Sequence, residues 1–201
     1  MHAYRSIYAS QGFERAGLFK TIRETYACRE VLYPGCWVHV TPSLYFPHVV
    51  YVDQSDAAEK FFEDERVVLE FVNRHKLYRQ STYIRFIRHD YTQPLPLRES
   101  GFDLLLALFA GGIARSCTKY LKPGGLLLTN NHQGDAADAI HAGLELKAVI
   151  HPKGNKYSVN EQNLDPEAIP LLSAIRTELK QGRRGIVYVE NETYYVFECS
   201  R

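Results

Sequence analysis

The chain of 201 residues lacks the cysteine and histidine patterns that are typical of disulfide-bonded and zinc-binding proteins. Its four cysteines are widely scattered and form no Cys-x-x-Cys pair, which indicates reduced thiols. Its eight histidines show no His-Glu-x-x-His or comparable spacing of metal ligands. The sequence therefore predicts neither a disulfide framework nor a metal site.

Long apolar runs and blocks of like charge are also missing. The longest apolar stretch, residues 102–114, is too short to cross a bilayer, and the first ten residues contain no apolar signal core. The 24 basic residues nearly balance the 23 acidic ones, and no aromatic-basic stripe is present to capture nucleic acid or an anionic membrane. We therefore expect a cytoplasmic protein that acts on a neutral or small molecule, without nucleic-acid or membrane partners.

The residues that are present have the composition of a globular domain. The chain is 45% hydrophobic and 23% charged, and it contains no low-complexity tract, internal repeat or linker. A chain of this length buries one large core. We expect a single domain over residues 1–201, in which residues 1–29 form a helical lid and residues 30–201 form the core.

Short runs of β-branched and other apolar residues recur along the chain, bounded by glycine, proline and aspartate. Runs of this kind predict strands, and continuous apolar runs predict strands that are buried on both faces. The predicted strands are residues 31–33, 49–52, 83–87, 102–108, 126–128, 144–150, 185–189 and 193–199, the last two paired as a hairpin around residues 190–192.

Apolar residues at a spacing near 3.6 predict helices between these strands. Thr41 and Ser55 are candidate N-caps, and Asp64 marks a break in the longest helical region. Because strands and helices alternate, the sequence predicts an α/β fold with a parallel sheet covered on both faces and antiparallel strands near the end of the chain. The predicted helices are residues 13–28, 41–46, 55–73, 113–120, 136–141 and 166–180.

In an open α/β sheet the ligand binds beyond the carboxyl ends of the strands, so the residues directly after each strand are the candidate site. Asp53 follows the second strand, 18 positions beyond Gly35, where an acid can accept hydrogen bonds from both ribose hydroxyls. After the third strand, Asp90 can accept from an exocyclic amine such as that of adenine, while Tyr91 and Phe109 can offer ring faces to a purine. These residues favour a nucleoside-containing cofactor.

Taken together, residues 31–131 resemble the class I S-adenosylmethionine-dependent methyltransferases. The strongest match is Tyr120 to Leu127, which resembles the family's most recognisable turn and strand. The resemblance implies a three-layer Rossmann-like sandwich with a mostly parallel seven-stranded sheet and an antiparallel strand near its C-terminal edge. It also implies S-adenosylmethionine as the cofactor, with Asp53 at the ribose and Asp90 at the adenine amine. The implied cofactor-binding residues are Pro34, Gly35, Cys36, Trp37, Asp53, Gln54, Asp90, Tyr91, Phe109 and Ala110.

The loop after the first strand departs from the family pattern. Where the family has an acid followed by three alternating glycines, residues 33–39 retain only Gly35 and place Tyr33, Trp37 and His39 at the other three positions. The missing glycines normally let the backbone approach the cofactor without a Cβ in the way. Trp37 and His39 must therefore point away from the cofactor, contact it or occupy its place. Trp37 is either a stacking surface for a ring or sulfonium or a hydrophobic plug, and Cys36 is expected to pack in the core.

His132, after the fifth strand, is the one candidate for a catalytic base, and its alternative role is that of an ordinary loop residue. Methyl transfer chiefly needs an in-line approach of the acceptor, so an essential base is not required. Residues 107–112 lack the Asn/Asp-Pro-Pro-aromatic sequence of enzymes that methylate adenine or glutamine nitrogen, which disfavours those substrates.

Three functions are consistent with these residues. The leading hypothesis is a small-molecule methyltransferase whose amino-terminal helix covers the acceptor. The alternative is a non-catalytic methyltransferase-like scaffold with a degenerate cofactor site, because a fold does not determine a function. A nicotinamide-dependent oxidoreductase is the third hypothesis. Such an enzyme requires a Gly-x-Gly-x-x-Gly sequence after the first strand, and this sequence is absent.

Overall fold

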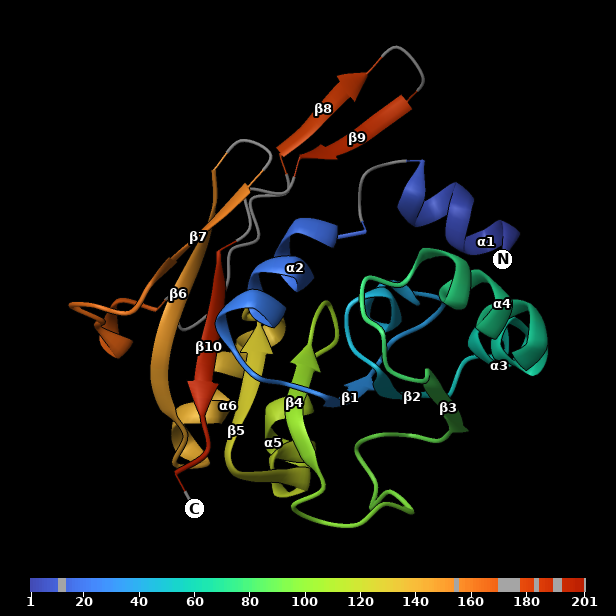
Figure 1. Ribbon diagram of the computed structural model, residues 1–201. Helices are drawn as coiled ribbons and strands as arrows, with labels where there is room; N and C mark the ends of the chain where they lie inside the picture. The colour runs from blue at the N-terminus through green and yellow to red at the C-terminus, as the bar shows by residue number, and fades with distance from the viewer. Residues whose placement is uncertain (11–13, 154–155, 170–177, 183–184, 190–192, 201) are drawn as a thin grey trace.

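The computed structural model describes residues 1–10, 14–153, 156–169, 178–182, 185–189 and 193–200. Its main sheet has eight strands in the order β3-β2-β1-β4-β5-β10-β6-β7, and β8 and β9 form a separate two-stranded sheet (Figure 1). The strands are β1 Glu30–Pro34, β2 His48–Asp53, β3 Tyr83–Arg88, β4 Phe102–Ala107, β5 Leu121–Thr129, β6 Glu145–Lys153, β7 Lys156–Asn160, β8 Glu178–Gly182, β9 Gly185–Val189 and β10 Tyr194–Glu198.

Helices cover both faces of the main sheet, as the α/β prediction requires (Figure 1). The longer ones lie on one face, and α5 and α6 lie on the other. The helical elements are α1 His2–Tyr4, the π-turn η1 Arg5–Ala9, α2 Ala16–Thr25, η2 Thr41–Leu44, α3 Asp56–Glu63, α4 Glu65–His75, α5 Ile113–Cys117, η3 Thr118–Tyr120, η4 His132–Gly134, α6 Asp135–His141 and η5 Pro166–Ala168.

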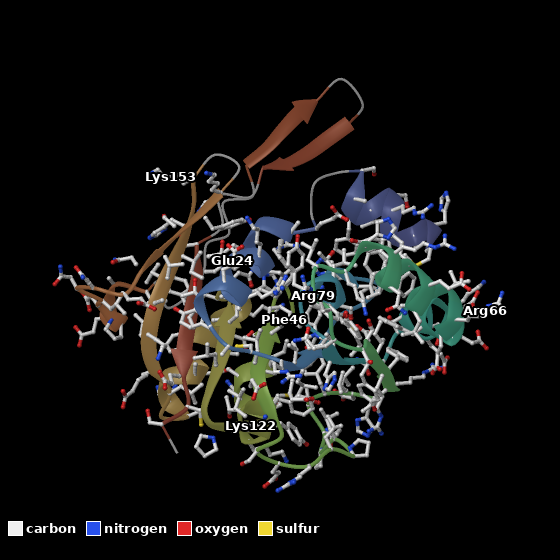
Figure 2. The ribbon with its side chains drawn as sticks, viewed as in Figure 1. Glu24, Phe46, Arg66, Arg79, Lys122 and Lys153 are labelled. Atoms are coloured by element: carbon white, nitrogen blue, oxygen red, sulfur yellow. The ribbon has the colours of Figure 1, made fainter. Side chains whose placement is uncertain are left out.

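Successive strand residues point into two different cores because side chains alternate along a strand. Val31 and Tyr33 of β1 pack under α2, α3 and α4, whereas Leu32 between them packs under α5 and α6. Phe46 lies fully buried in the first core, and Figure 2 shows its position inside the molecule. The first five strands of the main sheet are parallel, so their carboxyl ends meet at one edge. The arrowheads of β4 and β5 in Figure 1 point to this edge, beside α2.

The predicted three-layer fold is confirmed, with two corrections to the sheet. The main sheet has eight strands rather than seven, because β7 adds an antiparallel strand beyond β6. The predicted hairpin of residues 185–189 with 193–199 is wrong, since β9 pairs with β8 and β10 inserts antiparallel between β5 and β6. Val196 and Phe197 are both fully buried on opposite faces of the sheet, and only a central strand covered on both sides buries its residues in this way.

Three helix predictions also need correction. Thr41 is not an N-cap, because Val40 takes that position and the buried Thr41 hydroxyl lies 2.9 Å from the Tyr4 hydroxyl. The predicted helix 166–180 begins as the short η5 and ends within strand β8, and residues 170–177 lie outside the described part. The predicted helix 13–28 is shorter, and its residue 13 lies outside that part. The break at Asp64 and the Ser55 cap are confirmed.

None of the helices among the described residues has the length and apolar character that crossing a membrane requires. The same residues contain no group of three or more His, Cys, Asp or Glu side chains placed to hold a metal ion.

Candidate ligand site at the carboxyl ends of the strands

The carboxyl ends of the parallel strands, together with the loops that follow them, are called the ligand edge below. At this edge Asp53 joins the ends of β1 and β2. Its Oδ2 accepts a hydrogen bond from the backbone N–H of Trp37 at 2.8 Å, and its Oδ1 accepts one from the N–H of Ser55 at 2.8 Å. The carboxylate is therefore held between the β1 loop and the start of α3. Gln54, next to it, is exposed.

Gly35 is the point at which the loops after β1, β3 and β4 meet. It has a left-handed φ of 63°, and a Cβ at this position would lie 2.6 Å from the Ala110 Cβ and 3.5 Å from Cε1 of Tyr91. The Tyr91 hydroxyl donates to the carbonyl oxygen of Gly111 at 3.1 Å. The structure thus brings these predicted site residues together, and a side chain at position 35 would separate the loops.

Asp90 lies at the outer end of the same edge. Its Oδ1 accepts from both the N–H and the hydroxyl of Thr92, at 2.9 and 2.7 Å, and these bonds hold the pKa of the carboxyl below its usual value. Asp90 is therefore ionised at neutral pH, and its other oxygen still has acceptor capacity.

Pro34 and Cys36 are buried, so their side chains belong to the core rather than to a ligand surface. Burial raises the pKa of the Cys36 thiol well above its usual value, which keeps this group protonated and unreactive.

His39, at the position of the family's third glycine, points into the protein. The ring is 1% exposed, its Nδ1 lies 3.0 Å from the Tyr33 hydroxyl, and its Nε2 lies 3.3 Å from the carbonyl oxygen of Glu14. Tyr8 stacks on it with 4.3 Å between ring centroids. Burial, with a smaller effect of the Arg15 charge, lowers the pKa of His39 to about 3, so the ring is neutral.

Trp37 and Phe109 are the two exposed aromatic residues of the ligand edge, at 38% and 37% exposure. Both have a left-handed backbone, with φ values of 45° and 60°. Such a conformation costs a non-glycine residue about 1–2 kcal/mol, and strain of this kind is concentrated at functional sites. Of the seven described non-glycine residues with positive φ, five belong to this edge, namely Arg15, Trp37, Phe109, Asn131 and Gln133.

Arg15 and Tyr194 join the site from distant parts of the sequence. The guanidinium carbon of Arg15 lies 4.1 Å from the centroid of the Phe109 ring, and its Nε donates to the Tyr194 hydroxyl at 3.2 Å. Arg15 is only 8% exposed. No local pattern marks either residue as functional, because 179 positions separate them.

His132 lies near Phe109, with 6.0 Å between the two ring centroids. Its Nδ1 is buried and has no hydrogen-bond partner among the described residues. Burial lowers the pKa of His132, so the ring is neutral at neutral pH and can accept a proton.

Asp135 is a buried acid that the sequence did not reveal. It is fully buried at the start of α6, and its Oδ1 accepts from the N–H of Ala114 at 3.0 Å, while its Oδ2 has no partner among the described residues. Burial raises the pKa of Asp135 to about 6, and the N–H groups at the start of α5 oppose this effect.

This chain resembles known proteins in its fold. No protein-family model and no curated protein matches the sequence. The N-methyltransferase NodS of Bradyrhizobium japonicum, solved with S-adenosyl-L-homocysteine, matches with a TM-score of 0.56 and 12% identity over 94% of this chain and 87% of its own. The chain has the class I S-adenosylmethionine-dependent methyltransferase fold.

Two further structures show the same fold. A methyltransferase of Thermotoga maritima matches with a TM-score of 0.54 and 12% identity over 100% of this chain and 96% of its own. The [4+2]-cyclase SpnF matches with a TM-score of 0.50 and 16% identity over 70% of this chain, which spans 60% of that chain. At these identities the methyltransferase fold is established, and the activity has to be argued from the site itself.

Proposed function

We propose that this chain is an S-adenosylmethionine-dependent methyltransferase that acts on a small molecule. The observation that carries the proposal is the position of Asp53, whose two oxygens each accept one backbone N–H at the edge where parallel strands end. A carboxylate has about four acceptor positions, so Asp53 retains capacity for two ribose hydroxyls.

The residues around Asp53 fit the adenosine part of this cofactor. Asp90 is ionised and partly exposed beyond β3, where it can accept from the adenine amine. Gly35 allows the loops after β1 and β4 to approach each other below the ligand. Because these acceptors need hydrogen-bond donors, they favour a nucleoside over a ligand without polar groups.

When bound, the cofactor would supply an electrophilic methyl group. The chain would contribute orientation, since a single displacement needs the acceptor atom in line with the methyl carbon. We propose that His132, which is neutral, takes the proton of an acceptor that carries one. The segment of residues 1–29 would cover the acceptor, because Tyr8 and Arg15 contact rings of the edge. Four free cysteines are consistent with a reducing, cytoplasmic location.

A scaffold without catalytic activity is the second candidate, and one observation favours it. Tyr8 and the buried His39 occupy space beside the β1 loop where the family has glycines. If their side chains exclude the methionine part of the cofactor, the sheet would serve as a binding surface only.

Calorimetric and thermal-shift titrations with S-adenosylmethionine, S-adenosylhomocysteine and NAD distinguish these functions. At a hundredfold excess over the dissociation constant, a true ligand stabilises the native state by about 2.7 kcal/mol. We expect saturable binding of the first two compounds, which Asp53→Asn weakens at least tenfold and which the exposed control Glu63→Gln leaves unchanged. No binding to folded protein at millimolar ligand would contradict the proposal and favour the scaffold, and binding of NAD alone would favour the oxidoreductase.

A further inference from the structure

The ligand edge presents a set of aromatic rings in addition to the residues that the proposed function assigns to the adenosine part of the cofactor. We call Tyr8, Trp37 and Phe109 the aromatic rim. Trp37 and Phe109 follow the neighbouring parallel strands β1 and β4, and both rings remain more than one third exposed. Large aromatic side chains normally gain stability by burial, so exposure of two of them at one edge points to a ligand that covers them.

Hydrogen bonds hold both residues in their left-handed conformations. The N–H of Trp37 donates to Asp53, and the N–H of Phe109 donates to Oδ1 of Asn130 at 3.3 Å. The acceptors lie at the ends of β2 and β5, so the strand framework itself specifies where the two rings stand. Rings positioned before the ligand arrives lose little conformational freedom on binding.

Tyr8 contacts Trp37, and Arg15 contacts Phe109. Tyr8 lies edge-on to Trp37, with 6.3 Å between centroids and 61° between ring planes, and it stacks on the buried His39. On the side of Phe109, the Arg15 guanidinium covers one ring face at 4.1 Å. The Phe109 ring also lies 6.0 Å from the His132 ring, measured between centroids, and the residue remains 37% exposed.

We propose that the methyl acceptor is a planar aromatic compound that stacks on the aromatic rim. The identity of this site as an acceptor site rests on the proposed function, whereas the recognition of a planar ring rests on the rim alone. Stacked and edge-to-face ring pairs are favourable beyond the area that they bury, and a saturated ring of the same size lacks this interaction. Selectivity for planarity is thus the property that distinguishes the rim from a merely apolar surface.

Trp37 is the only tryptophan of the chain, so its fluorescence reports on the rim directly. The probes are matched pairs, namely phenol with cyclohexanol and catechol with cyclohexane-1,2-diol. We expect at least one planar compound to change Trp37 emission saturably and to bind at least tenfold more tightly than its saturated partner, as checked by calorimetry.

Two variants assign the effect to the rim. Phe109→Leu should weaken planar binding at least fivefold, and by a larger factor than it weakens the affinity for S-adenosylhomocysteine. Tyr83→Leu changes a more exposed ring on β3, at 49% exposure, and should alter neither affinity. Equal affinity for planar and saturated partners, or no planar binding by protein that binds S-adenosylhomocysteine, would overturn the inference. Planar binding without S-adenosylhomocysteine binding would instead overturn the proposed function and retain the rim.

Discussion

Single residues at the ligand edge act through close backbone approach and through buried charge. Gly35 permits a contact between loops that no other residue allows, and Asp135 carries a carboxylate with one unpaired oxygen into the core beneath the same edge. The first effect is steric and independent of pH, whereas the second depends on the protonation of a single group. Each leads to a prediction that a point mutation tests.

Gly35→Ala should lower the free energy of unfolding by about 2–5 kcal/mol, because the left-handed φ costs about 1–2 kcal/mol and overpacking adds about 1–3 kcal/mol. The added Cβ would lie 2.6 Å from that of Ala110. Gly112→Ala is the matched control, since its φ is 73° but a Cβ there meets nothing within 4 Å. Urea denaturation measures both losses, and equal losses would show that the Ala110 contact is unimportant.

Asp135→Asn should make folding stability less dependent on pH. The pKa of Asp135 in the folded protein, about 6, exceeds the value of about 3.9 in an unfolded chain, so its contribution to stability is present at low pH and is lost as pH rises through 6. Between pH 4 and pH 7.5, the free energy of unfolding of the variant should rise relative to that of the wild type by up to about 3 kcal/mol.

Denaturation of both proteins at the two pH values checks this prediction. His39 acts in the opposite direction, because its lowered pKa favours the unfolded state as pH falls below about 6.5. The difference between variant and wild type cancels that contribution. A difference that is the same at both pH values would show that Asp135 does not titrate in this range.

Secondary-structure elements are joined at the opposite edge of the sheet by Asp103 of β4. Its Oδ2 accepts from the N–H groups of Arg29 and Glu30, both at 2.9 Å, and its Oδ1 accepts from Nζ of Lys122 at 2.6 Å. Burial alone would raise the pKa of Asp103, but these bonds hold it below its usual value. One carboxylate thus connects the starts of β1, β4 and β5, and Figure 2 labels Lys122 at this edge.

Asp103→Ala should destabilise the protein by about 2–3 kcal/mol, because it leaves two backbone donors at the start of β1 without their acceptor. Lys122→Met removes only the ion pair with Asp103, and the Lys122 side chain is 40% exposed. This variant should lower the free energy of unfolding by less than about 1 kcal/mol. Thermal denaturation of the two variants compares them. A larger loss for the lysine variant would show that the ion pair, rather than the backbone bonds, carries the stabilisation.

The amino-terminal segment is part of the core on one face of the main sheet. Leu18, Phe19 and Ile22 of α2 are fully buried in the same cluster as Val31 of β1 and Val49 of β2. The described part of residues 1–29 therefore contributes to this core in addition to any role as a lid. We propose on this basis that the chain unfolds as a single domain.

Phe19→Ala should lower the free energy of unfolding by about 3–5 kcal/mol, since it leaves a cavity in a fully buried site. The loss should appear as one shifted transition, seen equally by circular dichroism and by Trp37 fluorescence. Leu77→Ala is the control, because this side chain is 54% exposed and should cost less than about 1 kcal/mol. Two separate transitions would contradict a single domain.

The sequence by itself determined the features that depend on neighbouring residues. Continuous apolar runs predicted the buried strands. Ser55 and Asp64, each followed by periodic apolar residues, predicted two helix starts. Both predictions were possible because burial and capping act over a few positions. The position of Asp53 opposite the β1 loop also followed, since parallel strands end at a common edge.

Only the tertiary structure decided which distant segments meet. It inserted β10 between β5 and β6, where the sequence pattern predicted a local hairpin. It also stacked Tyr8 on His39, placed Arg15 over Phe109 and buried Asp135. Local conformational preferences do not predict these contacts. The free energy of the contacts comes from packing, which exists only once residues far apart in the chain share one core.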